Sequence, residues 1–163
     1  MANAFGFCKY LVLLFIFLIS TSHLSLSSQE KEDIHDLLPK YGLPRGLIPD
    51  SVESYAVESS KFLYITLSSP CAVMIGGQHR LQYGRKIRGM FGGKGALHFV
   101  SGIEVRGNRG WRGVTKIVRR SNGFIEFDLD WSGFYYESFD AEDFDDVPVC
   151  SNEIVNVMLK SVV

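Results

Sequence analysis

The sequence predicts a mainly β fold, a small antiparallel β-barrel with a short N-terminal α-helix. Segments in which apolar and polar residues alternate recur at intervals of about ten residues along most of the chain. Turn-forming stretches rich in Gly, Pro, Ser and Asn separate these segments, and no long stretch shows helical periodicity. A series of short strands of this kind is typical of an antiparallel barrel or sandwich.

The expected helix covers residues 29–38. Its apolar residues repeat at helical spacing and form a single stripe of Ile34, Leu37, Leu38 and Tyr41. Pro39 and Gly42 are expected to end the helix. Because a helix this short is stable only when it is packed, the stripe should face the core. Residues 41–49 then predict a rigid turn, whose two prolines and two glycines exclude regular helix.

The expected strands follow from residue 52 onward. They cover residues 52–58, 61–67, 71–75, 81–87, 97–105, 113–118 and 123–131, with a further candidate strand at 134–139. Ser121-Asn122-Gly123 predicts a tight turn before the last of the main series. In 123–131, apolar residues such as Phe127 alternate with acidic residues such as Asp128, which predicts one packed and one solvated face.

The first 28 residues have the layout of a secretory signal peptide. Lys9 precedes the apolar run 10–19, and small polar residues fill 20–28. This run is about half of the roughly 20 residues that span a membrane as a helix. We therefore expect three parts: a removed signal peptide at 1–28, a single β-barrel domain at 29–152, and a C-terminal tail at 153–163. The expected location is the secretory pathway, ending outside the cell or in a lumen.

Cysteine content supports a disulfide. Cys8 would leave with the signal peptide, so Cys71 and Cys150 form an even pair in an oxidising compartment. A bridge closing a loop of this length would contribute roughly 4 kcal/mol to stability. The alternative is two free buried thiols.

The net charge of −1 conceals a strong segregation of charge along the chain. Residues 79–120 contain eleven Lys or Arg and a single acid, Glu104, whereas residues 121–153 contain ten Asp or Glu and no Lys or Arg. Two interpretations remain open: two solvated faces that attract each other, or a basic surface for an anionic lipid or polysaccharide. Secretion makes nucleic acid an unexpected partner.

Several sequence blocks resemble a plant family known only as domain of unknown function 538. They are Leu37-Leu-Pro-Lys-Tyr-Gly-Leu-Pro-Arg-Gly-Leu-Ile-Pro49, Ser51-Val-Glu-Ser-Tyr55, Ser69-Pro-Cys71, Tyr83…Ile87-x-Gly89, Ser101-Gly-Ile-Glu-Val105 and Val147-Pro-Val-Cys150. The resemblance covers roughly residues 34–150 and implies a small β-barrel with an N-terminal helix. Lipid binding of the bactericidal/permeability-increasing type and chlorophyll hydrolysis have both been proposed for this family. In a plant, the expected location becomes the apoplast, the vacuole or the endomembrane lumen.

No motif predicts catalysis, a metal or a cofactor. The Gly-x-Ser-x-Gly elbow of serine hydrolases is absent, and the spacing of His35, His79 and His98 does not indicate a triad. Residues 128–133 imitate the start of a calcium loop, but the twelfth position, where an acid is required, is Phe139. The stretch 92–95 also fails the pattern of a nucleotide-binding loop.

We therefore predict that the barrel binds an amphipathic or anionic small molecule without turnover, with contact to a membrane surface. The residues expected to line its interior are Leu43, Leu47, Tyr64, Tyr83, Phe99 and Trp131, while Arg85, Arg88 and Lys94 would guide a charged head group. One alternative is an esterase-type hydrolase acting on an apolar ester such as chlorophyll, which needs a nucleophile with a base in reach. A second alternative is a disulfide-stabilised module that docks a protein or a cell-wall polymer, which an interior without a cavity would favour.

Overall fold

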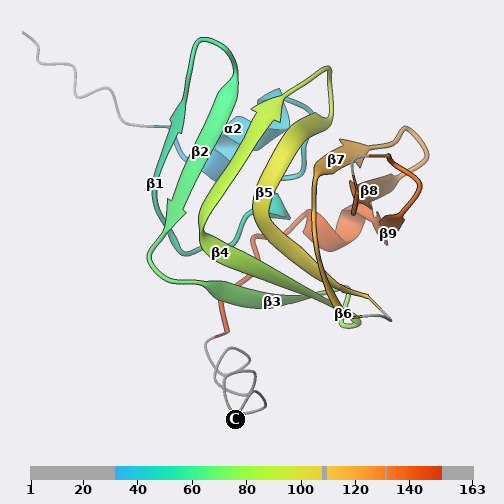
Figure 1. Ribbon diagram of the computed structural model, residues 1–163. Coiled ribbons are helices and arrows are strands. Elements are labelled where there is room, and N and C mark those ends of the chain that lie inside the picture. The colour runs from blue at the N-terminus through green and yellow to red at the C-terminus, as the bar shows by residue number, and fades with distance from the viewer. Residues whose placement is uncertain (1–31, 108–109, 131, 152–163) are drawn as a thin grey trace, which may run out of the picture. The chain divides into compact units, whose positions relative to one another are not determined.

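A computed structural model describes residues 32–107, 110–130 and 132–151 (Figure 1). The described residues lie in one compact unit that begins at Glu32. The expected signal peptide at 1–28 and tail at 153–163 fall outside them, so the predicted domain division stays a prediction. Within the described ranges, no helix has the length and apolar character needed to cross a membrane.

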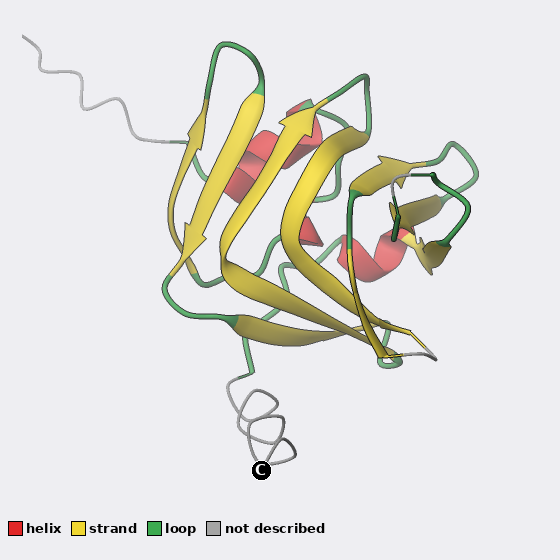
Figure 2. Cartoon of the chain, in the orientation of Figure 1, coloured by secondary structure: helices red, strands yellow, loops and turns green. Residues whose placement is uncertain are grey.

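The prediction of a mainly β fold is confirmed, since nine strands in the described chain form one antiparallel sheet (Figure 2). The strands are β1 (Val52–Val57), β2 (Phe62–Leu67), β3 (Cys71–Ile75), β4 (His79–Phe91), β5 (Ala96–Gly107), β6 (Gly110–Gly113), β7 (Lys116–Arg119), β8 (Phe124–Asp128) and β9 (Tyr136–Asp140). The main path through the sheet is β1-β2-β4-β5-β7-β8-β9, while β3 pairs with β4 and β6 pairs with β5.

The sheet does not close into a barrel, which corrects that part of the prediction. Strands β1 and β9 stand at the two ends of the path and do not pair with each other. Three helical segments supply apolar side chains to the core instead: α2 (Ile34–Lys40), η1 (Arg45–Leu47) and η2 (Ala141–Phe144). Leu38, Leu47 and Phe144, one from each segment, are fully buried. The apolar face of the open sheet is therefore covered by these segments rather than by the sheet itself.

Helix α2 differs from its predicted bounds at both ends. It begins at Ile34, because Asp33 is its N-cap and accepts a hydrogen bond from the backbone N–H of His35 at 3.0 Å. Pro39 lies inside the last turn and does not end the helix. The chain leaves the helix through Gly42, whose φ of 79° is in the left-handed region that glycine tolerates. The predicted apolar stripe does face the core.

Strands β4 and β5 are longer than predicted, and each pairs with two partners along one edge. Residues 86–90 of β4 pair with β2, and residues 79–83 pair with β3. Strand β5 pairs with β7 at its start and with β6 at its end. Consequently the expected strand at 113–118 is two strands, β6 and β7.

The predicted disulfide is confirmed. Cys71 at the start of β3 and Cys150 are bonded, with their sulfur atoms 2.05 Å apart. The bond joins the sheet to the segment that follows η2, and Cys71 is fully buried.

Candidate ligand-binding groove

Three of the predicted interior residues, Leu43, Leu47 and Tyr83, belong to a filled core. Each is 0% exposed. The hydroxyl of Tyr83 donates a hydrogen bond to the carbonyl oxygen of Leu47 at 3.0 Å, and burial raises the pKa of this hydroxyl above its usual value. These side chains hold the turn at η1 against β4, and none of them lines the surface hollows described below.

Tyr64 and Phe99 lie on the outside, with 37% and 55% of their surface exposed. Tyr64 alternates with the buried residues Leu63 and Ile65 and therefore points away from the core. Phe99 has a φ of 52°, which is rare for a bulky residue and marks a local irregularity in β5. The alternation of buried and exposed residues that begins at Leu97 is interrupted at this point. As a result, Val100 is buried and Phe99 is exposed. Neither aromatic residue lines an interior, contrary to expectation, and Trp131 lies outside the described residues.

The three predicted cations are spread over the surface. Arg88 lies directly across from Tyr64 in the pairing of β2 with β4, so these two predicted residues do come together. Arg85 is 3.5 Å from the carboxylate of Glu53. Lys94 is exposed at the tip of the β4–β5 hairpin, where the N–H of Gly95 donates to the carbonyl of Tyr41 at 2.7 Å. That N–H is therefore not available to an anion.

A surface groove that the sequence reasoning did not identify lies beside the β8–β9 hairpin. Its volume is about 350 Å³. Its lining consists of Gly107, Arg112, Leu129, Phe134, Tyr135, Tyr136 and Glu137, and we call it the aromatic groove. Phe134, Tyr135 and Tyr136 are 85%, 56% and 55% exposed. A large contiguous patch of exposed apolar side chains is uncommon on a folded protein.

The position of these aromatic residues follows from the hairpin register. Asp128 pairs with Tyr136, and the N–H of Leu129 donates to the carbonyl of Tyr135 at 2.8 Å. The chain from Phe134 to Tyr136 therefore lies at the end of the hairpin that connects β8 to β9. Three successive aromatic residues cannot all point to one face of a strand, and this was the available signal in the sequence.

Two charged side chains complete the aromatic groove. The guanidinium carbon of Arg112 lies 5.6 Å from the centre of the Tyr135 ring, within the range of a cation–π interaction. Glu137 directs its carboxylate toward Gly107, where a Cβ atom would lie only 3.2 Å from Oε1. Gly107 thus leaves space for the Glu137 carboxylate.

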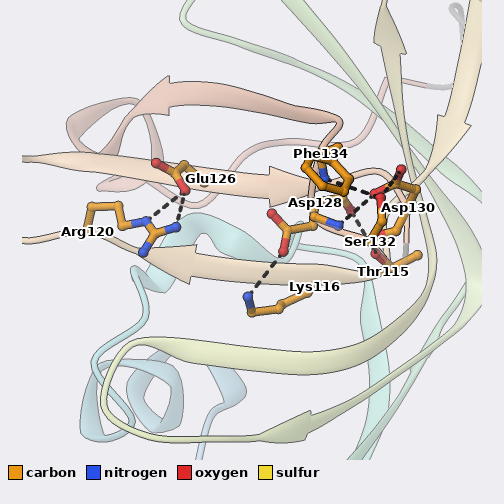
Figure 3. Close-up of polar contacts among 9 residues, drawn as sticks. Thr115, Lys116, Arg120, Glu126, Asp128, Asp130, Ser132 and Phe134 are labelled. Carbon is orange, nitrogen blue, oxygen red and sulfur yellow. Dashed lines mark hydrogen bonds and ion pairs between the residues drawn. The ribbon is translucent and has the colours of Figure 1, made fainter.

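A polar turn next to the aromatic groove fixes the start of the aromatic segment (Figure 3). The Ser132 hydroxyl donates to Asp130 Oδ2 at 2.7 Å, and the N–H of Gly133 donates to Oδ1 at 2.8 Å. These bonds, led by the one from Ser132, lower the pKa of Asp130. The Thr115 hydroxyl lies 2.9 Å from the Asp130 carbonyl oxygen and ties the turn to the preceding chain. Among the described residues, no cluster of three or more His, Cys, Asp or Glu is arranged to hold a metal.

Comparison with protein families identifies the family of this chain. A family model described as "Protein of unknown function, DUF538" matches residues 34–145, from α2 through η2. The chain belongs to the DUF538 family. The matched range includes every residue that lines the aromatic groove. No curated protein and no solved structure matches the chain.

A second hollow of this DUF538 protein, with a volume of about 190 Å³, brings His98, Ser132, Asp128 and Asp130 close together. The Ser132 hydroxyl is bonded to Asp130, as described above, rather than to an imidazole. A Cβ atom at Gly92 would lie 2.3 Å from His98 Nε2, so the ring is directed toward Gly92. The geometry of a nucleophile with its base is therefore not formed in this hollow.

The second hollow also contains a partly buried ion pair. Asp128 is only 8% exposed, and its carboxylate lies 3.2 Å from Lys116 Nζ (Figure 3). Removal of Lys116 would leave this mostly buried carboxylate without its charged partner. The pair joins β7 to β8, next to the turn that leads into the aromatic groove.

Proposed function

We propose that this DUF538 protein is a binding module without catalytic activity that holds an amphipathic, lipid-like molecule in the aromatic groove, at a membrane surface. The observation that carries the proposal is the exposure of Phe134, which is 85%, at the edge of a groove lined by Tyr135 and Tyr136. Exposed aromatic side chains of this kind lose unfavourable contact with water when an apolar partner covers them.

The composition of the aromatic groove supports an amphipathic ligand. Phe134 and Leu129 offer purely apolar surface, while the tyrosines combine an apolar ring with a polar hydroxyl. Arg112 adds a positive charge beside Tyr135. Tyrosine and arginine side chains suit the boundary between an apolar phase and water. The volume of about 350 Å³ is also in the range of small-molecule sites.

The proposal moves the ligand from the interior to the surface. We expected residues such as Leu43 and Tyr83 to line a cavity, and both are packed at 0% exposure. The amphipathic character of the expected ligand is retained, because the aromatic groove offers both apolar and charged groups.

We also propose that the protein acts after export, at an extracellular or luminal membrane surface such as that of the plant apoplast or vacuole. The apolar run at 10–19 and the disulfide between Cys71 and Cys150 support this location.

A second candidate function is a docking module for an anionic cell-wall polymer. The filled core around Tyr83 favours it over a barrel with an internal ligand, and exposed Arg88 lies beside Tyr64 on the outer face of the sheet. A pull-down with polygalacturonate that weakens with salt and with Arg85→Ala/Arg88→Ala would support it. Equal recovery of the wild type and the double variant would exclude this second function.

Sedimentation with lipid vesicles tests the main proposal. Phe134→Ala should lower vesicle binding by roughly tenfold or more, because burial of a Phe side chain contributes about 1.5–3 kcal/mol. Phe124→Ala is the matched control, since Phe124 is 39% exposed but lies at the opposite end of the β8–β9 hairpin. Wild-type binding by Phe134→Ala, or equal losses in both variants, would contradict the proposal.

A further inference from the structure

The aromatic groove contains two side chains of opposite charge. Arg112 and Glu137 both line it, yet no ion pair within 4.0 Å joins them in the described part of the chain. A ligand with a single charge would be attracted by one of these groups and repelled by the other. A zwitterionic ligand can satisfy both at once, so charge complementarity favours a ligand that carries both signs.

The aromatic rings indicate what kind of cation fits. The face of an aromatic ring attracts a cation without providing a hydrogen-bond acceptor, which suits a quaternary ammonium group that has no N–H to donate. Arg112 already lies over Tyr135, while Phe134 remains largely exposed. The carboxylate of Glu137 adds the negative charge that such a group requires.

The arginine indicates what kind of anion fits. A guanidinium donates two parallel hydrogen bonds to a phosphate, and its plane can also stack on an aromatic ring. Arg112 is partly buried and lies over Tyr135, which restricts its orientation before a ligand arrives. A restricted donor loses less conformational entropy when it binds.

We propose that the aromatic groove recognises the zwitterionic phosphocholine group. Its phosphate binds to Arg112, and its quaternary ammonium lies against Phe134 and the carboxylate of Glu137. The proposal rests on the proposed function and names the ligand class of the same groove. The phosphocholine group is shared by membrane phosphatidylcholine and by soluble phosphocholine, so the test must separate these two sources.

The first measurement compares vesicles of phosphatidylcholine with vesicles of phosphatidylglycerol that have the same acyl chains. The wild-type protein should bind phosphatidylcholine roughly fivefold more tightly or better, which corresponds to a cation–π contribution of ordinary size. Glu137→Gln should lose most of this preference while it still binds both kinds of vesicle. Glu142→Gln is the control, because it makes the same change of charge in η2, outside the aromatic groove.

The second measurement adds soluble phosphocholine to vesicle-bound protein and follows binding by titration calorimetry. Competition supports the proposal with the lipid head group as the source, and Arg112→Gln should abolish it. Binding of phosphocholine without any binding to vesicles supports the proposed chemistry with the soluble molecule as the source, and contradicts the membrane part of the proposed function.

Failure of the inference is distinct from failure of the proposed function. Equal binding to both kinds of vesicle, together with no effect of phosphocholine, would overturn phosphocholine recognition and leave the amphipathic groove intact. Absence of binding to any vesicle and to phosphocholine would overturn both. Circular dichroism of each variant establishes that it is folded before binding is compared.

Discussion

Two parts of the β8–β9 hairpin place the same kind of residue in opposite environments. On the packed face of the two strands, Phe127 and Phe139 are 0% and 2% exposed, and their ring centres lie 4.8 Å apart. Around the loop that connects the strands, the aromatic residues 134–136 are all more than half exposed. Phe144 of η2 contacts the buried pair, with its ring centre 5.8 Å from that of Phe127. The difference lies in the covering segment rather than in the residue type.

This contrast suggests that the two parts of the hairpin have different roles. The packed face covered by η2 contributes to stability, because large apolar side chains are removed from water there. The exposed loop contributes little to stability and retains apolar surface that a ligand can bury. The predictions below test that difference in order of decreasing effect on the free energy of unfolding.

The largest effect is expected on the packed face of the hairpin. Phe127→Ala should lower the free energy of unfolding by about 3–5 kcal/mol, because it leaves a cavity in the packed core. Phe134→Ala should change it by less than about 0.5 kcal/mol, because the side chain is largely in solvent. Urea denaturation followed by circular dichroism measures both. Similar decreases in the free energy of unfolding for the two variants would contradict the proposed difference between the two parts of the hairpin.

The disulfide should have the next largest effect. Replacement of Cys71 and Cys150 by Ser should lower the free energy of unfolding by about 2–5 kcal/mol, because the bond restricts the unfolded chain. Neither sulfur lines the aromatic groove, so ligand binding at temperatures where the variant is folded should be unchanged. Loss of binding by a variant with native circular dichroism would show that the bond also shapes the groove.

A smaller effect is expected at the buried tyrosine. Tyr83→Phe should lower the free energy of unfolding by about 1–3 kcal/mol, because the carbonyl of Leu47 loses its hydrogen-bond donor in the core. The raised pKa of Tyr83 means that the unfolded chain releases this proton at a lower pH than the folded protein does. Stability from this group is therefore complete below about pH 10 and falls as the pH rises above it. Denaturation between neutral and alkaline pH should show a weaker decline for the Phe variant, and an unchanged decline would contradict this assignment.

The smallest effect is expected at the polar turn. Ser132→Ala removes the main hydrogen bond that lowers the pKa of Asp130, so this pKa should rise toward its usual value. A lowered pKa in the folded state stabilises the fold above the usual Asp pKa, and this contribution disappears as the pH falls through the folded-state value. Carboxyl NMR titration of the wild type and of Ser132→Ala measures the shift. An identical pKa in both proteins would show that the turn does not depend on Ser132.

Much of the fold could be predicted because local patterns determine it. The helix has a single apolar face, formed by the stripe from Ile34 to Tyr41, and this face contacts the core. The pairing of Cys71 with Cys150 followed from the cysteine count in an expected oxidising compartment. The family resemblance agrees with the match over residues 34–145.

The remaining features depend on where chain segments meet in space. Barrel closure is decided by whether β1 and β9 pair, and no local pattern states that helical segments will cover the sheet. Alternation placed Phe99 inside, and its left-handed backbone conformation moved it outside. The aromatic groove combines residues from the end of β5, from β6, from the chain after β8 and from the start of β9. The run of aromatic residues at 134–136 was visible in the sequence, but the contact of Tyr135 with Arg112 was not.

Chemical-shift mapping with micelles of an alkyl phosphocholine detergent tests the central claim most directly, because it locates the ligand on the molecule. The backbone amide signals of Arg112, Leu129 and residues 134–137 should shift together as the micelles are added. Signals of Leu43, Leu47 and Tyr83 should stay in place, because those residues lie in a filled core. Shifts confined to the core residues, with the aromatic groove unaffected, would contradict the account.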